Sequence, residues 1–294
     1  MKANYMILQV GTNPIPNLIS CLALACDDAK IYLISTENNK SSIGTSIIAE
    51  NLKKKLLEKR PKLTIKIIIC DKSNRNKITK TANKIYDEIF KEDIDAEKNN
   101  VILDYTGGTK CMAAYFYDLL KEREKKEPSY NIAYSYVDSD LEKIIIEKVE
   151  ISSLAIEDVA NENNITIDDI VEAQGYKIIK REVNEANRTG NVLVKNDNNN
   201  KIEFDDLLIK NFKLLCIKKS NKSKKSECKM ELFHAKDNCI KIGGDQAALY
   251  FVCNCKDEDV RMLENDIKEL KKSYTKITNS FKYNDLENII NGEM

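Results

Sequence analysis

The sequence contains 294 residues, 42% of them apolar, which is enough for two domains with their own hydrophobic cores. Its 47 Lys and Arg balance its 47 Asp and Glu, so no global field draws the chain to nucleic acid or to a membrane surface. Nine cysteines, an odd number, occur without a signal peptide or an apolar run of membrane-spanning length. This combination predicts free thiols in a reducing cytoplasm and argues against a secreted disulfide framework.

The first half of the chain alternates between two hydrophobic periods. Short apolar runs predict strands at 5–10, 30–35, 63–70 and 101–105, and helical spacing predicts helices at 16–26, 41–59, 75–90 and 110–121. Residues 130–137 and 143–149 predict a closing hairpin. Repeated units of this kind predict an α/β fold, with a Rossmann-like, doubly wound parallel sheet in the order 3-2-1-4-5 and helices on both faces.

Two polar loops that contain glycine follow the first and the fourth predicted strands. They are Gly11-Thr12-Asn13 and Thr106-Gly107-Gly108-Thr109-Lys110. In the expected strand order both border the crevice where such folds bind ligands, and Thr36 after the second strand lines its side. Glycines allow close backbone approach, and the amides of a helix N-terminus point at anions. The loops therefore predict recognition of phosphate or ribose, without groups suited to breaking bonds.

A purely structural role for these loops stays open, because the glycines also suit a plain strand-to-helix turn. Two common kinds of nucleotide site are disfavoured. A dinucleotide cofactor does not fit because the first loop lacks G-x-G-x-x-G, and a nucleoside triphosphatase does not fit because G-x-x-x-x-G-K-[ST] occurs nowhere.

Three segments carry a resemblance to a known family: Val10 to Pro14, Asp104 to Met112, and Gly175-Tyr176. They resemble the CRISPR-associated Rossmann fold (CARF) domain, in the branch where it precedes a restriction-endonuclease-like module. The resemblance implies a type III CRISPR ancillary effector for antiviral defence, with residues 1–150 as the sensor and a homodimer that binds a cyclic oligoadenylate, expected to be the tetra-adenylate. A two-fold ligand suits such a dimer. The crevice and the family motif together give the expected ligand contacts Gly11, Thr12, Asn13, Thr36, Thr106, Gly107, Gly108, Thr109, Lys110 and Met112.

Residues 151–180 are expected to form a helical linker to a second domain at 181–294. A capping Thr166, acidic residues after it and a terminal Gly175 predict a short helix. In the resembled family such a segment transmits closure of the sensor, and a passive spacer fits the sequence equally well. The asparagine-rich residues 196–200 predict a hairpin turn.

The segment from Glu203 to Lys218 resembles the start of a PD-(D/E)xK nuclease core. The resemblance places a metal-binding acid at Asp205, and such cores use Mg²⁺ or Mn²⁺ to activate water beside a lysine. The next predicted strand lacks the expected Glu-x-Lys. Lys218 stands at the acid's position in an ungapped alignment, and Cys216 stands there if the lysine is kept in register.

A Glu-x-Lys motif occurs later, as Glu227-Cys228-Lys229, after the basic run 218–225. In one interpretation the run is an insertion, and Asp205, Glu227 and Lys229 form the catalytic site in which Asp205 and Glu227 bind the metal. The chain is then a ligand-activated nuclease that cuts DNA or RNA. In another, the domain is catalytically dead and serves as a dimerisation or partner platform, and in a third the sensor itself slowly cleaves its ligand.

A zinc site is a further possibility because His234, the only histidine, lies among several cysteines. The spacing argues against it, since residues 249–255 resemble a strand whose two cysteines share one face without a C-x-x-C knuckle. The basic run is typical of a solvated loop, because no aromatic residues are interleaved for base stacking. Residues 257–272 predict an amphipathic helix for core or dimer packing.

Overall fold

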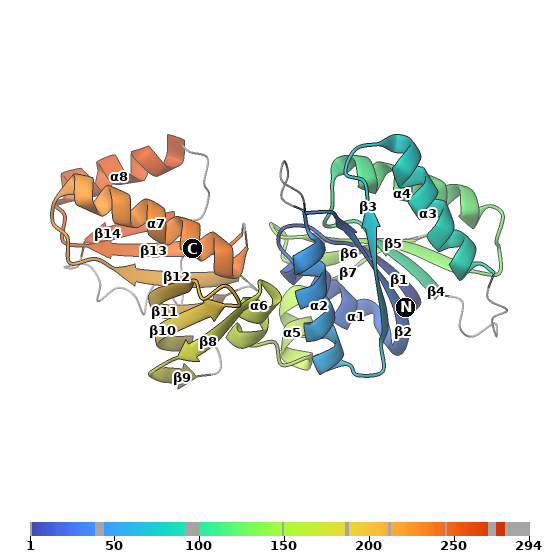
Figure 1. The fold of residues 1–294 in the computed structure, drawn as a ribbon, viewed down its shortest axis with the longest axis horizontal. Coiled ribbons are helices and arrows are strands. Elements are labelled where there is room, and N and C mark those ends of the chain that lie inside the picture. Colours follow the sequence, from blue (N-terminus) through green and yellow to red (C-terminus); the bar gives the residue numbers. More distant parts are fainter. Residues whose placement is uncertain are drawn as a thin grey trace. The chain divides into compact units, whose positions relative to one another are not determined.

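The computed structural model describes residues 2–38, 44–91, 100–148, 150–185, 188–210, 213–244, 246–269 and 275–279. The chain divides into two compact units, residues 1–164 and 165–294, and each has its own seven-stranded sheet (Figure 1). In the part of the chain that the structure describes, no helix is both long enough and apolar enough to span a bilayer.

The first unit confirms the predicted α/β class and strand order. Its sheet runs β3-β2-β1-β4-β5-β6-β7, parallel from β3 to β5 and antiparallel beyond. The strands are β1 Ala3–Gln9, β2 Ala25–Thr36, β3 Thr64–Cys70, β4 Asn100–Asp104, β5 Asn131–Asp138, β6 Lys143–Glu147 and β7 Ile151–Ala155. The helices are α1 Ile15–Leu24, α2 Ser46–Lys59, α3 Arg75–Ile89, α4 Lys110–Glu124 and α5 Ile156–Glu162.

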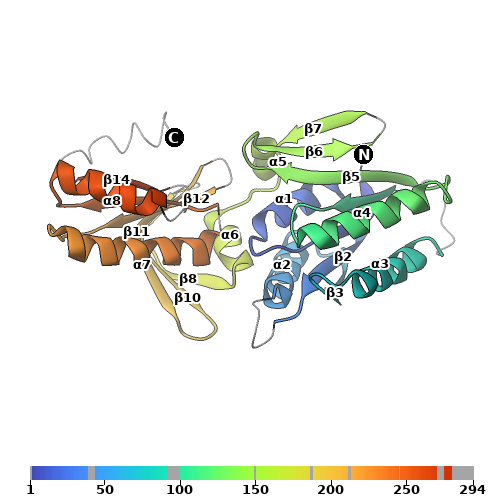
Figure 2. The ribbon, with the colours of Figure 1, turned by 90° about the horizontal axis from the view of Figure 1, so that it is seen from above.

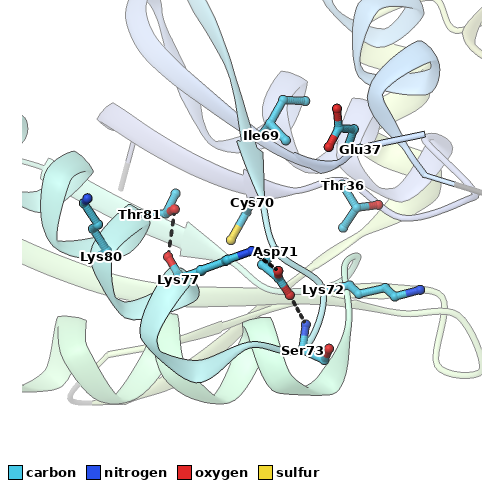
Figure 3. Close-up of a pocket in the computed structure, with 10 residues that line it drawn as sticks. All are labelled: Thr36, Glu37, Ile69, Cys70, Asp71, Lys72, Ser73, Lys77, Lys80 and Thr81. Carbon is cyan, nitrogen blue, oxygen red and sulfur yellow. Dashed lines mark hydrogen bonds and ion pairs between the residues drawn. The ribbon is translucent and has the colours of Figure 1, made fainter. Parts of the chain in front are cut away.

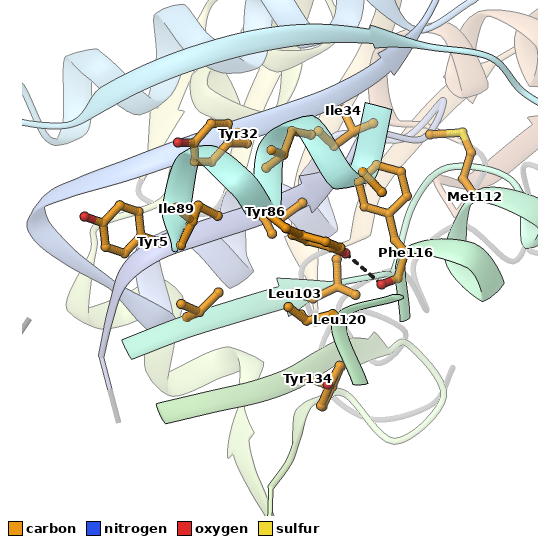
Figure 4. Close-up of a cluster of buried hydrophobic side chains, with 14 of the residues drawn as sticks. Tyr5, Tyr32, Ile34, Tyr86, Ile89, Leu103, Met112, Phe116, Leu120 and Tyr134 are labelled. Carbon is orange, nitrogen blue, oxygen red and sulfur yellow. Dashed lines mark hydrogen bonds between the residues drawn. The ribbon is translucent and has the colours of Figure 1, made fainter. Parts of the chain in front are cut away.

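Helices cover both faces of this sheet, which explains why its central strands are continuous apolar runs. Figure 2 shows α3 and α4 next to each other, and they share a buried cluster with alternate residues of the strands, such as Tyr5 and Ile7 (Figure 4). The Tyr86 hydroxyl is buried there and donates a hydrogen bond to the carbonyl of Phe116, 2.7 Å away, so it is not left without a partner. On the opposite face, α1 contacts both α2 and α5.

The first unit extends to residue 164, beyond the expected boundary at 150. Strand β7 adds to the edge of the sheet beside β6, and α5 packs on α1. All five residues of β7 are exposed, so no buried alternation in the sequence announces the strand. The expected short helix is α6, Ile167–Ala173, and it belongs to the second unit. Thr166 and Asp169 form the capping box that starts it.

The second unit has the strand order β14-β13-β12-β11-β10-β8, with β9 paired to β10. Strands β8, β10, β11 and β12 are antiparallel neighbours, whereas β12, β13 and β14 are parallel. The remaining bounds are β8 Tyr176–Lys180, β9 Val183–Glu185, β10 Arg188–Asn196, β11 Lys201–Lys210, β12 Lys213–Lys219, β13 Ala248–Cys253, β14 Thr275–Asn279, α7 Lys225–Gly243 and α8 Asp257–Glu269. The predicted hairpin turn lies between β10 and β11, where Asn199 has φ +63°.

The two faces of β12 have different surroundings. Leu215 and Ile217 join an apolar cluster with residues of β11 and β13. Cys216 points to the other face, where the Cys239 thiol of α7 is its neighbour. Because Asp206 pairs with Ile217 across the ladder, strand alternation places Asp205 and Lys218 on the α7 face together with Cys216.

Candidate functional site

The loops that follow β1 and β4 touch through their backbones. A Cβ atom built on Gly107 would lie 2.1 Å from the Gln9 carbonyl oxygen and 2.4 Å from the Gly11 nitrogen, so only glycine fits. A Cβ atom on Gly11 would stand 3.3 Å from the Gly107 Cα atom. Gly108 has φ +74°, which glycine adopts without strain. The structure thus brings together the two loops that the strand order places side by side.

A buried carboxyl group, Asp104 at the end of β4, anchors the second loop. Its Oδ2 atom accepts hydrogen bonds from the hydroxyls of Ser20 (2.7 Å) and Ser135 (3.0 Å), and its Oδ1 atom accepts from the Thr106 N–H (3.2 Å). Burial raises the pKa of Asp104, against the opposing effect of these donors. Helix α1, strand β5 and the loop are therefore tied to one buried carboxyl group.

Three of the expected ligand contacts use their side chains to shape the loops. Thr106 Oγ1 accepts from the Val137 N–H at 2.9 Å. Thr109 caps α4, because its Oγ1 accepts from the N–H of the residue at 112 (3.2 Å) and donates to the carbonyl of the residue at 72 (2.6 Å). Asn13 Oδ1 accepts from the Ile15 N–H at 3.1 Å, where α1 begins. These side chains hold the backbone in place.

Met112 differs from expectation, because it does not face the crevice. It is fully buried and packs in the cluster under α3 and α4 (Figure 4). Its methyl group lies 3.5 Å from the position of a Cβ atom built on Gly108, so Met112 supports the loop from below. Thr12, Gly108 and Lys110 are exposed and present the loops to solvent.

A cavity of about 540 Å³ lies at the ends of β2 and β3 (Figure 3). Thr36 lines it, and so do three lysines that sequence reasoning missed, Lys72, Lys77 and Lys80. Asp71 Oδ2 lies 3.5 Å from the Lys77 ammonium, and hydrogen bonds from the backbone N–H groups of residues 73 and 74 lower the pKa of Asp71. The Thr109 hydrogen bond to residue 72 joins the cavity wall to the loop after β4. The only available sequence signal was the polar run directly after β3.

In the second unit, Asp205 and Lys218 lie together on β11 and β12. The Asp205 Oδ2 atom is 3.9 Å from the Lys218 ammonium and accepts a 2.7 Å hydrogen bond from the Lys219 N–H. Both side chains line a cavity of about 310 Å³ with Glu203 and Glu182. Glu203 stands two residues before Asp205, on the same face of β11. Glu203 lies in the segment that resembles the start of a nuclease core, but no role was predicted for it.

The structure does not reproduce the expected Glu-x-Lys geometry at 227–229. Both residues lie on α7, and positions two apart on a helix point in different directions, whereas on a strand they share a face. Glu227 pairs with Lys222 (3.8 Å) and Lys224 (3.9 Å), and Lys229 pairs with Asp266 of α8 (2.9 Å). The α7 helix was not predicted, and it separates these side chains from the strand geometry that the motif needs.

Carboxylate groups for a hard metal ion are few. Within the described ranges, acidic side chains form no group of three with ligand atoms close enough for one ion. Cys216, which takes the motif's acid position when the lysine is kept in register, is fully buried. Glu203 and Asp205 remain as two carboxylates on one strand face. Mg²⁺ in nucleotide-processing sites is held by one or two carboxylates together with substrate phosphates, so these two residues fit it only with a substrate present.

The sequence comparison decides the family. A family model described as the Card1 CARF domain matches residues 6–169, which is more than half of the chain. The chain belongs to the CARF family. No curated protein sequence matches this CARF protein.

Two solved structures resemble this CARF protein along almost its whole length. Can2 from Sulfobacillus thermosulfidooxidans, in complex with cyclic tetra-adenylate, is 14% identical with a TM-score of 0.67, and the alignment covers 98% of this chain and 96% of Can2. VC1899 from Vibrio cholerae is 12% identical with a TM-score of 0.73, and the alignment covers 97% of this chain and 96% of VC1899. At these identities the likeness shows the fold, which includes a second sheet-based unit after the Rossmann-like sheet.

Proposed function

We propose that this CARF protein binds a cyclic oligoadenylate, with cyclic tetra-adenylate as the leading candidate, between two copies of the chain. The observation that carries the proposal is the backbone contact between Gly11 and Gly107. It holds exposed Thr12, Gly108 and Lys110 together at the carboxyl ends of neighbouring parallel strands. That edge is where doubly wound folds bind ligands, and the Can2 complex with cyclic tetra-adenylate has the same fold.

The electrostatics of the loops favour an anionic ligand. Lys110 supplies a positive charge at the start of α4, and the helix N-terminus adds partial positive charge from its amides. A symmetric ring with several phosphates then meets one such loop from each of two identical subunits.

Titration calorimetry of the full chain with cyclic tetra-adenylate, cyclic hexa-adenylate and linear tetra-adenylate tests this proposal. The expected result is binding of one cyclic ligand per two chains, with a dimer measured by light scattering. Lys110→Ala should weaken binding at least tenfold, whereas Lys126→Ala, just beyond the other end of α4, should leave it unchanged. No heat with any cyclic adenylate, or a monomer that binds one ring, would reject the proposal.

We further propose that the second unit is a ligand-activated, metal-dependent nuclease centred on Asp205. Glu203 and Asp205 are the carboxylates that would hold Mg²⁺ or Mn²⁺, and Lys218 lies beside Asp205 to stabilise charge on a phosphate. The ion, when bound, supplies an activated water. This assignment replaces Glu227 and Lys229, whose charges are engaged with Lys222, Lys224 and Asp266.

Labelled DNA and RNA, incubated with protein, ligand and either Mg²⁺ or Mn²⁺, test the nuclease proposal. Asp205→Asn and Glu203→Gln should each lower the cleavage rate at least a hundredfold. Glu227→Gln is the matched control and should keep the wild-type rate. If Glu227→Gln alone abolished cleavage, the assignment to β11 would be wrong.

A non-cleaving second unit is the alternative, and the burial of Cys216 at the motif's acid position favours it. That function predicts normal ligand binding with no cleavage of either nucleic acid under any metal condition. A sensor that degrades its own ligand would instead release linear adenylates without added metal. The same incubation, with labelled ligand, separates these outcomes.

A further inference from the structure

Three cysteines from separate segments of the second unit meet at one point. Cys228 lies near the start of α7, Cys253 ends β13, and Cys255 follows two residues later, before α8. Their sulfur atoms all lie within 4.8 Å of one another, and those of Cys228 and Cys255 are 3.1 Å apart. All three side chains are at most 2% exposed. His234, by contrast, is exposed and does not belong to this group of ligand atoms.

The backbone around this cluster explains how two cysteines at i and i+2 reach the same point. Strand β13 ends at Cys253 and the chain bends at Asn254. Cys253 and Cys255 are therefore not two positions of one regular strand, and the bend sets the distance between their sulfurs. The Asn254 N–H donates to the Lys222 carbonyl at 3.0 Å, and this bond ties the bend to the segment before α7. The expectation that the pair shares a strand face is therefore wrong.

Polar groups surround the sulfurs in a way that buried hydrophobic packing does not require. The Cys228 thiol donates to the Lys222 carbonyl at 3.3 Å, and the Cys253 thiol to the Thr278 carbonyl at 3.8 Å. The Cys255 N–H donates to the Cys253 sulfur, a bond that stabilises a thiolate. Cys228 also stands near a helix N-terminus, whose partial positive charge favours a thiolate.

We propose that Cys228, Cys253 and Cys255 form a binding site for one thiophilic metal cation, with Zn²⁺ as the best match. Zinc–sulfur bonds of about 2.3 Å in a tetrahedral site separate the sulfurs by about 3.8 Å. That separation lies between the 3.1 Å pair and the 4.8 Å limit of the cluster, so adjustments below about 1 Å suffice. Thiolates select soft ions, so the site is chemically distinct from any Mg²⁺ position at Asp205.

Metal binding at this site has a defined proton balance. Three sulfur–hydrogen bonds break, three sulfur–zinc bonds form, and three protons pass to the buffer. The affinity should therefore rise steeply with pH, and the number of protons released should report the number of cysteine ligands.

Cobalt titration of the chelator-stripped, reduced full chain tests the site. The expected result is a thiolate-to-cobalt charge-transfer band that saturates at one ion per chain and is abolished by one equivalent of Zn²⁺. Cys228→Ser should remove most of the band. Cys239→Ser is the matched control, since Cys239 is equally buried on the same helix but donates to the Ala248 carbonyl instead. Its spectrum should be unchanged.

A second measurement on the unmodified chain avoids any dependence on variants that fail to fold. Alkylation under reducing conditions, followed by peptide mass spectrometry, should show that Zn²⁺ slows the labelling of Cys228, Cys253 and Cys255 at least tenfold. The labelling of Cys111 in the other unit should not change. Absence of the cobalt band, a band that Cys228→Ser retains, or equal labelling with and without Zn²⁺ would overturn the proposal.

Discussion

Substitution of Gly107 by alanine is the most direct test of how the two sensor loops are held. The added Cβ atom would lie 2.1 Å from the Gln9 carbonyl oxygen and 2.4 Å from the Gly11 nitrogen. Real Cβ atoms essentially never approach closer than 3.0 Å, so the two backbones must separate by about 0.9 Å. Neither neighbour is a flexible side chain, and the separation therefore moves one whole loop.

The expected loss of stability follows from this forced displacement. Overpacking of a well-packed site costs about 1–3 kcal/mol, and the backbone contact places Gly107→Ala near the middle, at about 2 kcal/mol. For a unit of this size, about 2 kcal/mol lowers the melting temperature by roughly 4–8 °C. Because Thr12 and Lys110 flank the displaced contact, the affinity for cyclic tetra-adenylate should also fall at least tenfold, which is about 1.4 kcal/mol.

Calorimetric melting and ligand titration on the same preparations measure both effects. Gly11→Ala is the graded control, because its Cβ atom would stand 3.3 Å from the Gly107 Cα atom and needs only a few tenths of an ångström. Gly11→Ala should lower both the melting temperature and the ligand affinity by less than Gly107→Ala does. Unchanged melting in Gly107→Ala would refute the backbone contact. Lower melting with unchanged affinity would leave the contact intact and refute the placement of the ligand.

Three further substitutions test the supports of the sensor. Thr109→Ala removes the cap of α4 and should lower the free energy of unfolding in urea by about 1 kcal/mol, whereas Thr109→Ser should match wild type. Met112→Ala leaves a cavity and should cost about 2–5 kcal/mol in the same titration, and a smaller loss would contradict its burial. Although burial opposes it, hydrogen bonds from Lys66 and Lys30 lower the pKa of Glu88 from 4.5 to about 2, so its stabilisation is complete above pH 4.5 and is lost as the pH falls through 2. Glu88→Gln should therefore cost roughly 1 kcal/mol at neutral pH and nothing near pH 2, and a cost independent of pH would refute the pairing.

The centre of the first unit's sheet was predictable because its strands β1 and β4 are buried on both faces. Continuous apolar runs such as 101–103 leave few alternatives, and the rule for doubly wound folds then gives the order of the strands. Strand β7 was not predicted because none of its residues is buried. Helix α7 was not predicted because lysines and cysteines interrupt the apolar residues on its buried face. One of these lysines, Lys236, is itself buried and donates to the Ala247 carbonyl at 3.1 Å.

The contact between the two loops was predictable, but the direction of their side chains was not. The motif places Thr106, Thr109 and Met112 within seven residues, and the sequence does not reveal which of them face inward. The structure turns both threonine hydroxyls to the backbone and Met112 into the core. The cysteine cluster was missed for a similar reason, because spacing rules assume a regular strand through Cys255, and the strand ends at Cys253.

The two ion sites proposed for the second unit share one short segment of backbone, residues 219–222. The Lys219 N–H donates to Asp205 at 2.7 Å, and the Lys222 carbonyl accepts at 3.0 Å from the N–H of Asn254, which lies between Cys253 and Cys255. A change at the cysteines can therefore reach Asp205 through three residues of chain. It cannot do so by competition for metal, since thiolates and carboxylates select different ions.

This connection makes a kinetic prediction that rests on both proposals. If the chain cleaves nucleic acid, Cys228→Ser should lower kcat severalfold, because the donor to Asp205 is held less firmly, while the Mn²⁺ concentration for half-maximal rate stays unchanged. Cys239→Ser should alter neither quantity. A shift in the Mn²⁺ requirement with unchanged kcat would contradict the argument, because it would mean that the cysteines act on the ion itself and not on the backbone beside Asp205.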